Sequence, residues 1–203
     1  MSTVDICTIQ IDHLLQGNQI FLPLSLKKEL IQYTCTVKLG QKQAHASVQY
    51  KQNLSNEIVI SQPLADDLRL PENRVKLQFY VNKGTLIFGP VVMIWTDVPF
   101  KKGLDPFYIF CKEMITVGQK NGIFTYVQVK NYPKGWLWNG DRWKETAALP
   151  EPDVIYNRIH SRKYENTSAF AALKSKWEDA IIFNDHFLNK WSIYELLFTD
   201  GQV

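Results

Sequence analysis

The feature that most constrains this chain is an internal repeat within its first ninety residues. Residues 19–39 align without a gap with residues 57–77, and apolar side chains recur at the same places in both segments. A duplication of this kind indicates two copies of one structural unit. The matched apolar pairs are Ile20/Ile58, Leu22/Ile60, Leu26/Leu64, Leu30/Leu68, Val37/Val75 and Leu39/Leu77.

Each copy is predicted to form a short strand, a turn, one or two helical turns and a second strand. The leucines of each short helix recur four positions apart, which gives that helix one buried face. A single copy cannot bury its apolar face alone, so we expect the two to interlock into one closed barrel over residues 1–90.

Two known barrels share this pattern. It resembles the double-psi β-barrel, and it also resembles the swapped-hairpin barrel of small bacterial transcription regulators, which have one unit per chain and dimerise. Two units in one chain favour the intramolecular barrel. The barrel is interpreted either as a structural or docking module, which we favour, or as a surface that binds DNA or a peptide.

Beyond the barrel, strand and helix patterns alternate. Such alternation predicts a small, mostly parallel sheet with right-handed crossovers. We therefore expect a two-module fold of the α+β or α/β class, with an α/β domain over residues 91–188 and a linker helix within 189–203. The predicted strands are 89–95, 123–129, 153–159 and 181–187, and the predicted helices are 105–122, 167–180 and 189–198.

Two local patterns give more detailed predictions. Asn139-Gly140 indicates a type I′ turn in a tryptophan-rich hairpin over residues 134–145. This turn would pair Trp136 with Trp143 and place three tryptophans on one face. In the helix predicted for 105–122, an apolar stripe is expected to face the core, formed by Phe107, Phe110, Cys111, Met114 and Val117.

Polar residues follow every predicted strand of the second module. In open α/β sheets, ligands bind outside the carboxyl ends of the strands. The candidate ligand-binding residues at this edge are Asn157, Arg158, Arg162 and Asp97. The two arginines offer forked donors for a carboxylate or a phosphate. The alternative is that these groups cap helices and pair with Asp97 or Asp185.

Composition and motifs exclude several functions. The net charge of +3 is small and evenly spread, so it predicts neither a nucleic-acid nor a membrane partner. Three cysteines without a short spacing favour a reducing compartment over disulfides or a zinc site. No signal peptide, membrane-length apolar run, dinucleotide or P-loop motif, zinc-protease motif or nucleophile elbow is found. We therefore predict no catalytic residue and no metal site.

Three segments carry a family resemblance, namely "LIFGPVVMIWT", "PDVIYNRIHSR" and "FNDHFLNKWSIYELL". Behind a duplicated barrel, they resemble the endospore coat-associated proteins of the YheC/YheD family of spore-forming Firmicutes, within the ATP-grasp superfamily. The resemblance implies a barrel-like region, a pre-ATP-grasp α/β domain and then the ATP-grasp fold. Enzymes of that superfamily activate a carboxylate as an acyl phosphate and transfer it to an amine or thiol, with Mg²⁺ on the nucleotide phosphates.

The resemblance assigns this chain the substrate side of such a cleft, including Asn157, Arg158 and Arg162. ATP and Mg²⁺ are expected only in a full-length family member, because this chain has no glycine-rich phosphate loop and no downstream acidic pair. Two hypotheses remain. The chain is the N-terminal part of a ligase, whose partner is an ATP-grasp domain in cis, or a stand-alone binding or coat-assembly scaffold that contacts spore-coat proteins. The expected location is the mother-cell cytoplasm or the spore coat.

Overall fold

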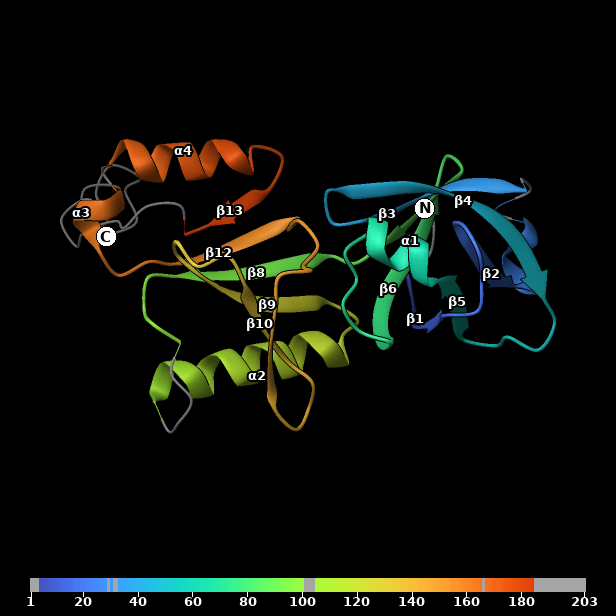
Figure 1. Cartoon of the computed structure of the whole chain (residues 1–203), viewed down its shortest axis with the longest axis horizontal. Coiled ribbons are helices and arrows are strands. Elements are labelled where there is room, and N and C mark those ends of the chain that lie inside the picture. Colours follow the sequence, from blue (N-terminus) through green and yellow to red (C-terminus); the bar gives the residue numbers. More distant parts are fainter. Residues whose placement is uncertain (1–3, 29, 31–32, 101–104, 166, 185–203) are drawn as a thin grey trace, which may run out of the picture.

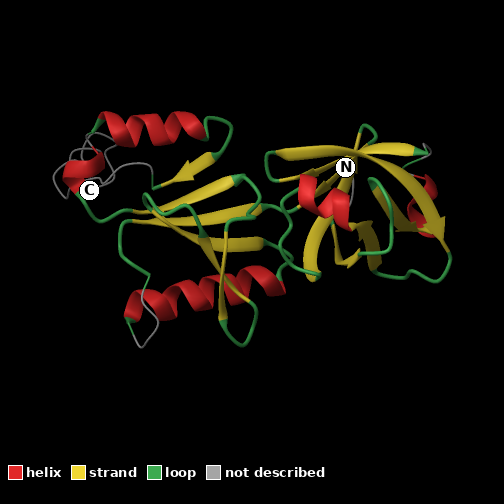
Figure 2. Cartoon of the chain, viewed as in Figure 1, coloured by secondary structure: helices red, strands yellow, loops and turns green. Residues whose placement is uncertain are grey.

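The computed structural model describes residues 4–184 apart from 29, 31–32, 101–104 and 166. These residues form a closed barrel of seven strands and a separate six-stranded sheet with helices on both faces (Figures 1 and 2). The predicted fold of two β-containing modules is therefore confirmed. The predicted helix 189–198 lies outside the described residues.

The barrel is formed by the first seven strands, in the order β1-β5-β2-β4-β3-β7-β6, and closes where β6 pairs with β1. Two short helices connect its strands. The elements are β1 (Asp5–Asp12), β2 (Gln19–Pro23), the 3-10 helix η1 (Leu24–Lys28), β3 (Thr34–Leu39), β4 (Lys42–Lys51), β5 (Glu57–Ser61), α1 (Gln62–Asp67), β6 (Arg74–Asn82) and β7 (Thr85–Phe88).

The sequence repeat corresponds to a structural repeat. The first copy forms β2, η1 and β3, and the second forms β5, α1 and β6. All twelve residues of the six matched apolar pairs are buried in the core. The equivalent strands β2 and β5 lie antiparallel, with Ile20 opposite Ile60. The predicted interlocking of two copies into one barrel is confirmed, and its finer double-psi topology stays a prediction.

The second sheet contains four parallel strands and an antiparallel hairpin at one edge. Its order is β11-β10-β9-β8-β12-β13, and the pairs β9/β8, β8/β12 and β12/β13 are parallel. The mostly parallel sheet predicted from the sequence is thus confirmed. The strands are β8 (Val91–Thr96), β9 (Phe124–Val129), β10 (Gly135–Trp138), β11 (Trp143–Thr146), β12 (Val154–Arg158) and β13 (Ile181–Phe183).

Helices lie on both faces of this sheet, α2 (Pro106–Lys120) on one and α4 (Ser168–Lys176) on the other, and the short α3 (Arg162–Glu165) precedes α4 (Figure 1). Asp105 caps α2, accepting a 2.8 Å hydrogen bond from the backbone N–H of Phe107. The apolar stripe predicted for α2 was partly wrong. Met114 and Val117 are exposed, because the helix packs through Cys111, Ile115 and Gly118.

The tryptophan-rich hairpin forms with a different register from the one predicted. Trp138, not Trp136, lies opposite Trp143, and Trp136 lies opposite Glu145. The Asn139 side chain explains the difference, because its Oδ1 accepts hydrogen bonds from the backbone N–H groups of Asp141 and Arg142. A four-residue loop therefore replaces the two-residue turn. Trp138 and Trp143 are buried against the α2 side of the sheet.

The barrel and the sheet are joined by backbone hydrogen bonds and by a shared core. The Gln78 N–H donates to the Gly122 carbonyl at 2.7 Å, and the Gln41 N–H donates to the Glu151 carbonyl at 3.1 Å. One cluster of buried apolar side chains includes barrel residues and also Met93, Trp95 and Phe170. The two modules are thus packed together through both polar and apolar contacts.

Candidate functional site

The carboxyl ends of the parallel strands meet at one edge of the second sheet, which we call the carboxyl edge. It is formed by Thr96 at the end of β8, Val129 at the end of β9 and Arg158 at the end of β12. This edge lies on the side of the sheet away from the barrel (Figure 1). Its position follows from the parallel register, since parallel strands must end together.

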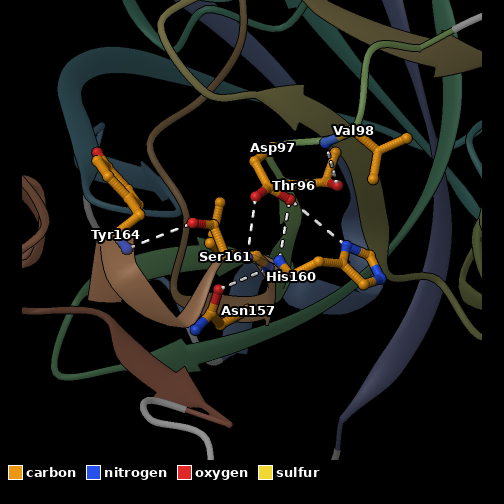
Figure 3. Close-up of polar contacts among 8 residues, drawn as sticks. Thr96, Asp97, Val98, Asn157, His160, Ser161 and Tyr164 are labelled. Carbon is orange, nitrogen blue, oxygen red and sulfur yellow. Dashed lines mark hydrogen bonds and ion pairs between the residues drawn. The ribbon is translucent and has the colours of Figure 1, made fainter. Parts of the chain in front are cut away.

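Asp97 holds the loop that follows β12. Its Oδ1 accepts a hydrogen bond from the His160 backbone N–H at 2.9 Å, and its Oδ2 accepts one from the Ser161 N–H at 3.1 Å (Figure 3). The His160 Nδ1 lies 3.4 Å from Oδ1. Burial alone raises the pKa of Asp97, but these hydrogen bonds outweigh burial, so that its pKa lies below the usual value. Asp97 is therefore a charged anchor between β8 and β12.

Asn157 is also engaged in holding the backbone. Its side chain is buried on the face of β12 opposite to the one that carries Arg158. The Oδ1 accepts a 3.0 Å hydrogen bond from the Ile159 N–H, and the Nδ2 donates to the Asn184 carbonyl at 3.0 Å. Asn157 thus links the end of β12 to the residue that follows β13.

Arg158 lies on the α2 side of the sheet. Its guanidinium carbon is 5.2 Å from the centre of the Phe110 ring and 5.7 Å from that of Tyr156. The Nε is buried and has no hydrogen-bond partner. Within the described ranges of the chain, no acidic residue forms an ion pair with Arg158. Its planar cation is therefore held by aromatic rings, with donor capacity left over.

The backbone of Arg162 begins α3, but its side chain lies outside the described part of the structure, as do Asp185 and His186. The structure thus brings Asp97 to the loop after β12 and places Asn157 and Arg158 on opposite faces. Ligand binding by these four residues stays a prediction.

Two contacts at this edge were not foreseen from the sequence. The Lys130 Nζ, which follows β9, lies 3.0 Å from the centre of the Tyr164 ring in α3. The His160 ring packs edge-on against Phe107 in the first turn of α2, with ring centres 6.2 Å apart. The sequence shows Lys130 at the end of a predicted strand and Phe107 near the start of a predicted helix. Neither identifies its partner, because both partners are distant in sequence.

The three cysteines are buried, and the potential metal ligands in the described part of the chain are not grouped. Burial raises the pKa of Cys7 and Cys111 to about 12 and that of Cys35 to about 11, so these thiols stay protonated at neutral pH. The described residues contain no group of three histidine, cysteine, aspartate or glutamate side chains that could hold a metal ion. Within those same residues, no helix is long and apolar enough to span a membrane.

The fold and this edge define a class of protein, in which a closed duplicated barrel precedes an α/β module with an anchored, polar carboxyl edge. The chain is 27% identical over 199 residues to the endospore coat-associated protein YheD of Bacillus subtilis (strain 168). This match covers 92% of the chain and 43% of the relative, so the chain spans less than half of that protein's length. It confirms the predicted relationship to the YheC/YheD family. No family model and no solved structure matches the chain.

Proposed function

We propose that this chain is a binding module of an endospore coat-associated protein, in which the carboxyl edge supplies the substrate-side half of a ligase cleft. The observation that carries the proposal is Arg158, which has a buried Nε without a partner at the end of a parallel strand. Similarity to YheD over 92% of the chain supports the association with the spore coat. We infer a location in the coat or in the mother cell that builds it.

The geometry of Arg158 favours a small carboxylate or phosphate as the ligand. A guanidinium presents paired N–H donors that match the two oxygens of such an anion. The carboxylate predicted as its alternative partner, Asp97, is engaged with the backbone of His160 and Ser161. Phe110 and Tyr156 lower the water access of the cation, which strengthens its attraction for an anion.

Nucleotide chemistry is assigned to other residues of a full-length family member. An ATP-grasp reaction needs Mg²⁺ on the nucleotide phosphates, and the sequence of this chain has no glycine-rich phosphate loop to hold those phosphates. We infer that ATP and Mg²⁺ would be bound by an ATP-grasp domain in cis, while this chain binds the group that is activated.

The test is a titration of wild-type protein and Arg158 variants with phosphate and with glutarate, followed by NMR. Arg158→Ala is expected to weaken anion binding on the order of tenfold, equivalent to one charge-assisted hydrogen bond, and to change the melting temperature little. Arg158→Lys keeps the charge but lacks the paired N–H donors, so its anion affinity should lie between those of the wild type and Arg158→Ala. Arg142→Ala removes an exposed arginine from the hairpin loop and serves as the matched control.

A structural role for Arg158 predicts a different result for the same variant. If Arg158 is instead a structural strut paired with Asp185, the other partner predicted from the sequence, Arg158→Ala should cost about 3–5 kcal/mol of stability, because that carboxylate would be left unpaired. A large loss of melting temperature with unchanged anion affinity would reject the binding role. It would favour the second candidate, a non-enzymatic scaffold for coat assembly, which the coat association of YheD supports.

A further inference from the structure

A cleft between the two modules carries a second, independent inference. It has a volume of about 450 Å³, within the range of small-molecule sites. The barrel contributes residues 71–76, the loop before β6 and the start of that strand. The second module contributes Gln119 from the end of α2, Asn139 from the hairpin loop and Lys144 from β11. Both modules are therefore needed to build it.

Hydrogen bonds hold the barrel and the second module together around this cleft. The Gln78 side chain donates from Nε2 to the Asn121 carbonyl at 2.7 Å, and its backbone N–H donates to Gly122. In the cleft itself, the Lys144 Nζ donates to the Pro71 carbonyl at 3.3 Å. The cleft is thus bordered by elements that are already fixed, which reduces the cost of ordering them around a ligand.

Positive charge predominates among the lining side chains. Arg74, Lys76 and Lys144 line the cleft together with one acid, Glu72, and three amides. Arg74 pairs with Glu57 through one nitrogen at 3.1 Å, and a guanidinium has further donors. Burial raises the pKa of Glu72, although the nearby Lys144 acts in the opposite direction. The negatively charged form of this single acid is therefore disfavoured in the cleft.

We propose that this cleft binds a small molecule with two or more carboxylate or phosphate groups, held between Lys76 and Arg74 of the barrel and Lys144 of the hairpin. The amide groups of Asn73 and Asn139 add donors and acceptors for the polar body of such a ligand. A ligand of this kind would join the barrel to the second module through charge-assisted hydrogen bonds.

The experiment titrates the whole 203-residue chain with citrate, with inorganic phosphate and with acetate, and follows backbone amides by NMR. Citrate is expected to bind saturably and more tightly than acetate, with shifts at residues 72–76, 139 and 144. Lys76→Gln and Lys144→Gln should each weaken citrate binding on the order of tenfold. Glu72→Gln should strengthen it, because a repelling carboxylate is removed.

Lys120→Gln is the matched control, since it removes the same charge near the end of α2 from a residue that does not line the cleft. It should change the affinity by less than about twofold. Lys76→Gln breaks no hydrogen bond of the described structure, so its result stands even if Lys144→Gln loosens the hairpin. Absence of saturable citrate binding, or equal effects of Lys76→Gln and Lys120→Gln, would overturn the proposal. Shifts confined to the Arg158 edge would reject this cleft and leave the proposed function intact.

Discussion

Gly122 offers a sharp test of how the two modules are joined. It follows α2 and has a φ of +68°, and its carbonyl accepts a hydrogen bond from the Gln78 N–H of the barrel. A Cβ at this position would lie 2.6 Å from the Gln78 nitrogen and 3.0 Å from the Leu77 carbonyl carbon. Both are backbone atoms, so the clash cannot be relieved by rotating a side chain. Gly122→Ala must therefore move the barrel away from α2.

The loss of stability expected for Gly122→Ala can be divided into its causes by comparison with Gly17. Gly17 has almost the same φ, +63°, but nothing lies within 4 Å of its added Cβ. Gly17→Ala should therefore cost only the left-handed backbone strain, about 1–2 kcal/mol. Gly122→Ala adds overpacking of about 1–3 kcal/mol and a weakened hydrogen bond worth about 1 kcal/mol. We expect about 3–6 kcal/mol in total for Gly122→Ala.

The assay is urea unfolding monitored by tryptophan fluorescence, combined with hydrogen exchange at the Gln78 amide. Gly122→Ala should lower the free energy of unfolding more than Gly17→Ala does, and it should speed exchange at Gln78. Equal losses in the two variants, within about 0.5 kcal/mol, would refute the steric argument. Unchanged exchange at Gln78 would show that the contact between the modules tolerates the added methyl group.

Three further predictions concern the barrel, the carboxyl edge and nucleotide binding. Leu26→Ala and Leu64→Ala should each cost about 2–5 kcal/mol in chemical denaturation, because both leucines are buried in equivalent helices; a loss below about 1 kcal/mol would contradict this. Asp97→Asn should cost about 1–3 kcal/mol at neutral pH. Folding lowers the pKa of Asp97. Its contribution to the free energy of unfolding is therefore present above its unfolded pKa and is lost as the pH falls through the folded pKa. The stabilities of wild type and Asp97→Asn should converge in acid. Calorimetry of the 203-residue chain with MgATP should show no binding isotherm, and a clear magnesium-dependent one would mean that nucleotide-binding residues had been overlooked.

The barrel was predictable because the repeat encodes burial directly. Ile20 and Ile58, like Leu39 and Leu77, match in sequence and are buried alike in the structure. Apolar spacing alone was sufficient to predict this part of the fold. The register of the hairpin was not predictable in the same way. Asn139 favours a tight turn by its backbone preference, but its side chain binds two N–H groups and opens the loop instead.

The carboxyl edge was predictable in position but not in its contacts. The order of strands and helices indicated where the parallel strands end, and polar residues marked that edge. Adjacent residues of a strand point to opposite faces, which separates Asn157 from Arg158 despite their adjacency. The partners of Asp97 and Lys130 come from segments far along the chain, and such pairings depend on tertiary packing that a single sequence does not encode locally.

The pairing of β1 has a consequence for biosynthesis. This first strand of the barrel forms its ladders with β5 and β6, from Thr8 beside Glu57 to Asp5 beside Phe79. Its partners are therefore translated about fifty to seventy residues later, and contacts of such separation form slowly. During synthesis, β1 therefore cannot form its hydrogen bonds with β5 and β6 until most of the barrel has emerged from the ribosome. We expect ribosome-bound chains that end between the two repeats to remain unfolded and to be a target for chaperones.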